Sequence, residues 1–249
     1  MINRDLWKDQ SFQNINRFPC PYCNTGILIG QNSPIKQITN SGKVYAEHNY
    51  PYGISHIFSG VLKCSNDKCN DVVAVTGEYL TGIDASYQND YNEYIENYIN
   101  LFQPKFFYPN LKLFPIIQEV PDNIKSLINE SFALYFSDYS ACANKIRIAI
   151  EAILDDLDID RTLTNPKNGK VSSLTLHKRI EIYEEKNPDL AKFLMAMKII
   201  GNEGSHSTTT TIDNLLDAFE ILEYFIENIY SKNSERIKEL ANKIVDKKY

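Results

Sequence analysis

The pattern of apolar and polar residues changes character near residue 120. Before that point, short apolar stretches alternate with turn-forming Asn, Ser, Gly and Pro, which is typical of short strands. After it, apolar residues recur at the spacing of amphipathic helices. The chain therefore predicts an α+β fold, in which a small β module precedes an all-α bundle. The predicted strands are residues 26–29, 43–47, 57–63 and 72–79.

The second half predicts a series of helices that can bury their apolar stripes against one another. Their expected ranges are 123–137, 140–157, 174–186, 188–200, 212–230 and 234–246. We expect the first two to form an antiparallel hairpin. Cys142 falls on the apolar stripe of the second helix, so we interpret it as a core residue and not as a nucleophile.

A connecting segment is expected between the two halves. A helix is predicted over 90–102, and an aromatic, proline-punctuated stretch follows it up to Pro121. Because proline lacks an N–H group, this stretch is expected to lie extended on one of the domains, with its aromatic rings used for packing more than for stacking on nucleobases. The predicted domains are residues 1–89, 90–121 and 122–249.

Two cysteine pairs in the β module have the spacing of metal knuckles. Cys20-Pro-Tyr-Cys23 is a CxxC pair, and Cys64 and Cys69 form a wider second pair. A short turn lets two sulfurs converge on one ion, and two such turns complete a tetrahedral shell. We therefore expect a zinc-ribbon module with a structural zinc ion. A catalytic zinc is disfavoured because four thiolates leave no open coordination position.

Alternatives remain open for these cysteines. They could be reduced and packed as small hydrophobic side chains, and His48 or His56, which lie between the pairs, could replace one of them as a ligand. Disulfides are not expected. The chain has no run of about 20 apolar residues and no apolar signal core after residues 1–5, so we expect a cytoplasmic protein that does not enter a membrane.

The charge balance is acidic, with a net charge of −6. Proteins that bind nucleic acid through many phosphate contacts usually carry a basic excess, so broad, sequence-independent binding is not expected. One local basic cluster gathers around a loop, although such clusters are more often solvated surface. Its members are Arg161, Lys167, Lys170, Lys178 and Arg179. The chain contains no P-loop, GxGxxG, HExxH or GxSxG motif.

The most informative segment is Gly201-Asn202-Glu203-Gly204-Ser205-His206, which follows the apolar helix predicted to end at residue 200. This segment is either a functional site or a polar helix cap, because it places two glycines, an amide, a carboxylate and an imidazole at a helix end. The helix 140–157 also has a polar stripe, which carries Arg147 and Glu151. Their spacing predicts an ion pair on an exposed face.

These residues support a family resemblance. The chain resembles domain-of-unknown-function family 4145 of the HEPN-like superfamily, over roughly residues 100–232. The resemblance implies a HEPN-like bundle of four or five helices that often dimerises, and a zinc knuckle accompanies such domains. The matching pieces are Phe106-Phe-Tyr-Pro109, Val120-Pro121, Arg147-Ile-Ala-Ile-Glu151-Ala, Leu176-His-Lys-Arg-Ile180 and Lys198-Ile-Ile-Gly-Asn-Glu-Gly-Ser-His206.

The resemblance also implies site residues. In active HEPN ribonucleases an Arg, a polar residue and a His form a metal-independent site at a dimer interface. His206 matches the His and Asn202 the polar residue, whereas Gly201 stands where the Arg would. Lys198 occupies the place of an Arg that is usual in the narrower family, and Arg147, on a helix expected to pack nearby, could supply the missing guanidinium.

Two functions follow from these residues. One is a metal-independent endoribonuclease, a toxin or phage-defence effector, with His206 in proton transfer and Lys198, Arg147 and Asn202 on phosphate. The other is a non-catalytic HEPN-like module that forms a homodimer and binds RNA, a nucleotide or a partner protein of a defence system, with zinc supporting the fold. The acidic balance and the missing Arg favour the binding module.

Overall fold

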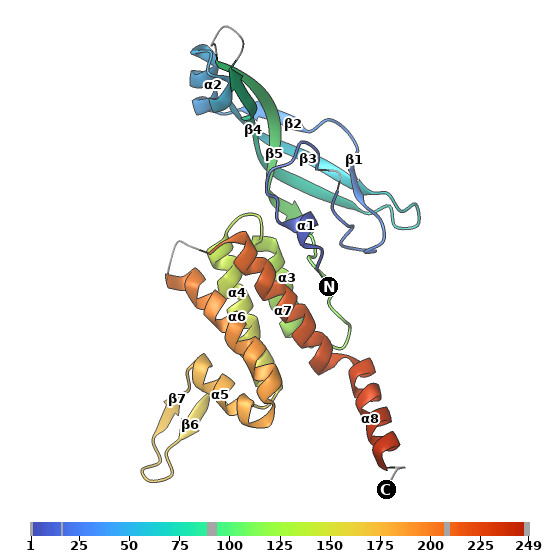
Figure 1. The fold of residues 1–249 in the computed structure, drawn as a ribbon, viewed down its shortest axis with the longest axis vertical. Coiled ribbons are helices and arrows are strands. Elements are labelled where there is room, and N and C mark those ends of the chain that lie inside the picture. Colours follow the sequence, from blue (N-terminus) through green and yellow to red (C-terminus); the bar gives the residue numbers. More distant parts are fainter. Residues whose placement is uncertain (1, 16, 89–93, 207–209, 247–249) are drawn as a thin grey trace. The chain divides into compact units, whose positions relative to one another are not determined.

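The computed structural model describes residues 2–15, 17–88, 94–206 and 210–246. It divides into two compact units, which are described separately below. Arg4–Lys112 form the sheet unit, and Leu113–Tyr249 with Met1–Asn3 form the helical unit. The architecture is therefore mixed α+β, with an antiparallel sheet first and helices after it (Figure 1).

The sheet unit is built on one curled antiparallel sheet in the order β1-β3-β4-β5, with β2 paired to the first half of β3. Its strands are β1 (Leu28–Gly30), β2 (Ile35–Ile38), β3 (Ser55–Cys64), β4 (Val72–Gln88) and β5 (Tyr94–Tyr108). The strands β4 and β5 are long and pair along most of their length, with register shifts at two places. Two short helices complete the unit, α1 (Arg4–Trp7) and α2 (Asn40–Glu47).

One face of the sheet is covered by the N-terminal segment of the chain. Trp7 and Phe18 stack with ring centroids 5.3 Å apart, and Phe18 meets Phe107 of β5 edge-on at 5.5 Å. Phe12 and Phe102 exchange two backbone hydrogen bonds of 2.8 Å. The core of the unit lies between this segment and the inward residues of β3 and β4, which include Phe58, Leu62, Val73 and Val75.

Two sequence predictions are wrong in this unit. Residues 43–47, predicted as a strand, lie in α2, whose N-terminal N–H groups are partly satisfied by the Thr39 hydroxyl. Of the helix predicted over 90–102, residues 94–102 lie in β5 because the chain pairs there with the long strand β4, and residues 90–93 lie outside the described part of the structure. The strand continues through Pro104, which is tolerated opposite Gly77 at a register shift in an edge strand.

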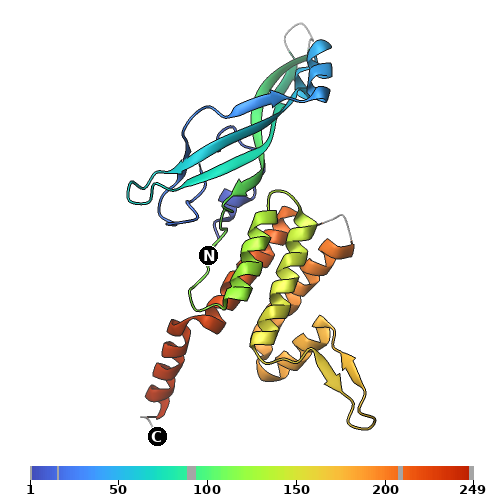
Figure 2. The ribbon, with the colours of Figure 1, turned by 180° about the vertical axis from the view of Figure 1, so that it is seen from behind.

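The helical unit packs α3, α4, α6 and α7 against one another, and α5 packs on α4 and α6. Figure 2 shows a small hairpin, β6 (Thr162–Thr164) and β7 (Val171–Ser173), extending from the end of these helices where α4 ends. The helices are α3 (Asp122–Leu134), α4 (Tyr139–Asp156), α5 (Leu176–Lys186), α6 (Pro188–His206), α7 (Ile212–Tyr230) and α8 (Lys232–Asp246). No described helix has both the length and the apolar character that a bilayer span requires.

The core of the helical unit forms where the predicted stripes meet. The ring centroids of Phe132 in α3 and Phe219 in α7 lie 5.4 Å apart. Ile146 and Ile150, four residues apart on α4, are also buried. Cys142 is fully buried, donates to the Ser131 carbonyl at 3.2 Å, and has a thiol pKa raised by burial. Its interpretation as a core residue is confirmed.

The helix α6 is longer than predicted. It continues from Pro188 through the hexapeptide to His206, so Gly201 lies inside a helix and not after one. A Cβ atom at Gly201 would stand 2.9 Å from Cβ of Arg147 and 3.2 Å from the carbonyl oxygen of Ala143. The glycine therefore permits close contact between α6 and α4, and this packing outweighs its low helix propensity.

Replacing Gly201 should destabilise the helical unit. In Gly201→Val the added atoms overlap Arg147 and Ala143, which should lower the free energy of unfolding by about 1–3 kcal/mol. Denaturant unfolding followed by circular dichroism measures the change. The control is Gly82→Val in β4, where the nearest atom to an added Cβ is at 3.6 Å. Equal stability of both variants and the wild type would contradict the close contact.

Candidate functional site

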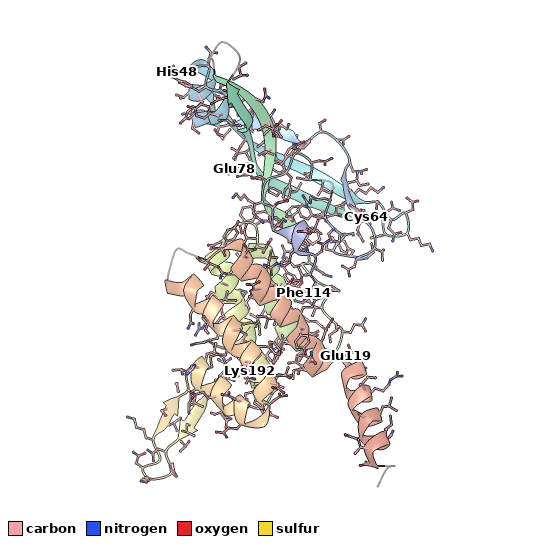
Figure 3. The ribbon with its side chains drawn as sticks, in the orientation of Figure 1. His48, Cys64, Glu78, Phe114, Glu119 and Lys192 are labelled. Atoms are coloured by element: carbon pink, nitrogen blue, oxygen red, sulfur yellow. The ribbon has the colours of Figure 1, made fainter. Side chains whose placement is uncertain are left out.

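The paired cysteines of the sheet unit converge at one end of β3. Cys20 and Cys23 lie in the loop before β1, Cys64 is the last residue of β3 and Cys69 lies in the turn before β4. Figure 3 labels Cys64 at this position on the sheet. All four Sγ atoms lie within 4.8 Å of one another. The structure thus brings together the four residues that the spacing predicts as ligands.

Both knuckles close through the same backbone conformation. Asn24 and Asn70, each directly after the second cysteine of its pair, have a φ of 54°. Each donates its N–H to a carbonyl four residues earlier, Asn24 to Cys20 at 2.9 Å and Asn70 to Asn66 at 3.0 Å. Asparagine tolerates this left-handed conformation better than most residues. The two turns therefore present their sulfurs in a similar way.

The sulfur positions fit a tetrahedral thiolate site. Sγ of Cys20 lies 3.8 Å from Sγ of Cys69, and Sγ of Cys23 lies 3.6 Å from Sγ of Cys64. A zinc ion with bonds of about 2.3 Å to sulfur places its ligands about 3.8 Å apart. These are also contact distances too long for disulfides, and all four cysteines are free. The cluster can hold a metal ion, and its geometry is consistent with zinc.

Backbone N–H groups donate to two of the sulfurs, but the thiol pKa values of the two knuckles differ, since burial raises the pKa of the Cys64 thiol. The Gly26 N–H donates to Sγ of Cys23 and the Asn66 N–H to Sγ of Cys64, both at 3.4 Å. Hydrogen bonds from the Thr25 side chain and from the Thr25 and Gly26 backbone lower the pKa of the Cys23 thiol to about 5. Thiolates are the form that binds metal, so the first knuckle is prepared for an ion.

Gly26 lets the two knuckles approach each other. A Cβ atom at this position would overlap Sγ of Cys64 and would lie 3.0 Å from the backbone nitrogen of Asn66. The two histidines considered as alternative ligands are not part of the cluster. His48 directly follows α2, and His56 lies in β3 with its ring centroid 5.9 Å from that of Tyr79.

In the helical unit, the structure brings Arg147 beside the hexapeptide. Its Cβ is the atom closest to the side-chain position of Gly201. The guanidinium forms the predicted ion pair, with Nη2 at 3.1 Å from Oε1 of Glu151. Since α4 and α6 run in opposite directions (Figure 1), Glu151 lies further from the end of α6 than Arg147 does, whereas Asn202 directly follows Gly201.

The other predicted site residues lie on α6 itself. Lys198, Asn202 and His206 are spaced four residues apart in one continuous helix, so their Cα positions follow one side of it. Lys198 and Asn202 are partly exposed. The side chain of His206 lies outside the described part of the structure, and only its helical backbone is described.

A buried arginine joins α5 to α4. Arg179 is only 3% exposed, and its Nη2 donates to Oδ1 of Asp155 at 2.7 Å and to the Ile159 carbonyl at 2.6 Å. Nη1 donates to the Glu151 carbonyl at 3.3 Å, and Nε is buried without a hydrogen-bond partner among the described residues. Asp155 also accepts from Nε and Nη2 of Arg161.

This network orders the charges at the end of α4. Hydrogen bonds from Arg161, together with the charge of Arg179, hold the pKa of the Asp155 carboxyl below its usual range. Asp155 therefore stays ionised and orients both arginines. The Arg161 side chain remains 61% exposed, so this guanidinium is positioned but accessible to solvent.

The arginines line a cleft of about 480 Å³, which we call the arginine cleft. Three arginines, one glutamate and three hydroxyl-bearing residues line it, together with the beginning of α5, and the side chain of Arg179 is buried there. Its lining residues are Arg147, Glu151, Arg161, Thr162, Ser173, Leu174, Thr175, Leu176 and Arg179. The three arginines still outnumber the carboxylates when Asp155, the partner of Arg161 and Arg179, is counted with Glu151.

Sequence reasoning missed this grouping, although part of its signal was available. Arg161 and Arg179 belong to the basic cluster noted around one loop, but Lys178 pairs with Glu181 on the surface. The sequence predicts no partner for Asp155. The ion pair between Asp155 and Arg179 spans 24 residues, so only the packing of α5 on α4 reveals it.

Comparisons with known proteins identify two family models, one in each half of the chain. A model described as Domain of unknown function (DUF8608) matches residues 9–107, and one described as Domain of unknown function (DUF4145) matches residues 129–247. The second is the family whose resemblance the sequence motifs indicate; the first was not predicted. No curated protein and no solved structure matches the chain. The similarity is thus to uncharacterised domain families.

We expect the purified chain to bind one zinc ion through the cysteine cluster. Cys23→Ser and Cys69→Ser should each lose the metal and destabilise the sheet unit, because the thiolate shell is then incomplete. Elemental analysis measures zinc content, and the thiolate-to-metal absorption of the cobalt form reports sulfur ligation. Cys142→Ala is the control and should keep the metal, since Cys142 is buried in the other unit. Full zinc content in Cys69→Ser would contradict the site.

Proposed function

We propose that this protein is a binding module whose arginine cleft takes the phosphate groups of a nucleotide or of RNA. A structural zinc ion, held by Cys20, Cys23, Cys64 and Cys69, supports a zinc-ribbon-like sheet unit, and the helical unit is a HEPN-like bundle that carries the ligand site. The observation that carries the proposal is the convergence of Arg147, Arg161 and Arg179 on one cleft.

The chemistry of the cleft suits a phosphate. A guanidinium carries more N–H donors than the bonds of Arg161 to Asp155 use, and its planar fork matches phosphate oxygens. Thr162, Ser173 and Thr175 add hydroxyl donors at the rim. The first N–H groups of α5 have no partner within the helix, and their dipole favours an anion.

The acidic composition of the chain is compatible with this local site. The net charge of −6 disfavours a ligand that must contact the whole surface. A cleft that holds one or two phosphate groups needs only a local excess of positive charge. Binding there should weaken as the salt concentration rises, because each phosphate contact releases counterions.

A second candidate, a metal-independent ribonuclease, is favoured by one observation. Lys198, Asn202 and His206 recur along one side of α6, so an amine, an amide and an imidazole are available at helical spacing. Histidine titrates near neutral pH and can transfer protons without a metal ion. Under this proposal His206 acts as acid or base, while Lys198, Asn202 and Arg147 bind phosphate.

The binding proposal is tested with ATP and with labelled single-stranded RNA as probes. Arg161→Ala should weaken binding of a phosphate-bearing probe at least tenfold, because it removes the exposed guanidinium and leaves Arg179 paired with Asp155. Calorimetry and fluorescence anisotropy measure the affinities. Lys178→Ala is the charge-matched control, since Lys178 pairs with Glu181 outside the lining of the cleft. The proposal fails if neither probe binds the wild type, or if both variants lose affinity equally.

The ribonuclease proposal predicts RNA cleavage that persists in EDTA and is abolished in His206→Ala. Gel analysis of tRNA, rRNA and mRNA after incubation measures the cleavage. His177→Ala is the matched control, because His177 lies on α5 beside Glu181 and should retain full activity. Intact RNA after incubation with excess wild-type protein would exclude this activity. If His206→Ala instead lowers the melting temperature by several degrees without changing any activity, the histidine is structural.

A further inference from the structure

The sheet unit has an open face with an apolar surface. Six side chains point away from the covered side of the sheet, and each is about half exposed or more, with Tyr108 at 81% and Ile35 at 78%. They are Ile35, Ile57, Val61, Val72, Phe106 and Tyr108. When one side of an antiparallel sheet faces water, its outward residues are normally polar. A contiguous apolar surface of this kind indicates an interaction site.

The register of the sheet makes this open face continuous across four strands. Ile35 of β2 pairs with Ser59 of β3, which pairs with Thr76 of β4, and Phe106 of β5 follows in the same row. In the neighbouring row, Val61 pairs with Ala74, and Ala74 pairs with Tyr108. The two aromatic rings therefore lie beside aliphatic residues and small polar residues. Lys105, the extra residue at the register shift of β5, directly precedes Phe106 and is partly exposed.

We propose that the open face packs against the open face of a second copy of this chain, giving a two-fold dimer of sheet units. Apolar and aromatic residues at the centre with few charges are typical of the buried part of a protein interface. A base-stacking surface for nucleic acid would instead combine its aromatic rings with a positive groove. On β3 and β4, the charged outward residues between 57–63 and 72–78 are one lysine and one glutamate, Lys63 and Glu78.

The positions of these two charges make the open face complementary to itself. Lys63 pairs with Val72 at one end of the face, and Glu78 pairs with Ile57 at the other. Figure 3 shows Glu78 well separated along the sheet from Cys64, the neighbour of Lys63. In a two-fold interface every contact occurs twice. An axis that runs across the strands between the two sheets brings Lys63 of each copy toward Glu78 of the other.

The size of the surface is appropriate for a dimer. A standard interface buries about 800 Å² on each partner, and Phe106 and Tyr108 can contribute the 58% and 81% of their surface that remains exposed. Two such rings with four branched aliphatic residues form the centre of an interface of that class. Sheets stacked face to face lie about 10 Å apart, which lets the long Lys63 and Glu78 side chains meet at the edges. This dimer is distinct from one formed through the helical bundle.

The test measures the mass of the zinc-loaded full chain by light scattering across a concentration series. The wild type should be a dimer, and Val61→Lys should raise the dimer dissociation constant at least tenfold. Lys63→Glu should also weaken the dimer, because the new carboxylate of each copy then faces Glu78 of the other copy, and this repulsion occurs twice in a two-fold dimer. The double variant Lys63→Glu with Glu78→Lys should recover wild-type association, since the two charges are exchanged. Leu163→Lys, at an equally exposed apolar site in the helical unit, is the control and should remain dimeric.

Two results would overturn the proposal. A wild-type chain that is monomeric at every concentration shows that the open face does not join two copies. A dimer that persists in Val61→Lys and Lys63→Glu shows that the copies meet elsewhere, for example through the helical bundle. Circular dichroism and zinc content confirm that the variants are folded, and loss of RNA binding in Phe106→Ala without a change of mass would assign the face to nucleic acid instead.

Discussion

The geometry of the helical unit depends on one buried positive charge, the guanidinium of Arg179. Taking an arginine out of water costs on the order of several kcal/mol unless an opposite charge and hydrogen bonds replace the solvent. Asp155 supplies the charge, and the carbonyl groups of Glu151 and Ile159 accept further bonds. These partners come from the end of α4 and the residues after it, so they fix α5 against α4. The same carboxylate orients Arg161, and the wall of the arginine cleft is thus a consequence of burying Arg179.

The stability of the sheet unit is limited by a different constraint, because its apolar side chains are divided between the two faces of the sheet. Consecutive residues of β3 such as Ile57 and Phe58 point to opposite faces and are both apolar, and only the face of Phe58 is covered by residues of the N-terminal segment. A sheet with a thin core gains stability from a cross-link at its end. The cysteine cluster lies where the loop before β1 meets the end of β3, which is the place where a bound ion would join segments far apart in the sequence.

The sequence predicts well those elements whose causes are local. Most helices of the second half appear within about three residues of their predicted bounds, because each has its own apolar stripe and most have a capping side chain, such as Asp138 or Thr211. The cysteine cluster was also predictable, since ligand spacing within a turn is a local property. The strand β5 was not, because its apolar spacing suits a helix as well, and the choice is made by pairing with β4. Glycine at 201 suggested a helix end, whereas contact with α4 keeps the helix intact. The arginine cleft depends on partners brought together only by packing.

The backbone pairing of Phe12 with Phe102 has a consequence for the order in which the protein can be made. It links one of the first segments of the sheet unit to its last strand, so the covered face of the sheet is complete only after β5 has left the ribosome. The second cysteine knuckle emerges earlier, since Cys69 precedes β4. During synthesis the two knuckles can therefore meet while Trp7, Phe12 and Phe18 still lack part of their cover, and metal capture can precede closure of the core.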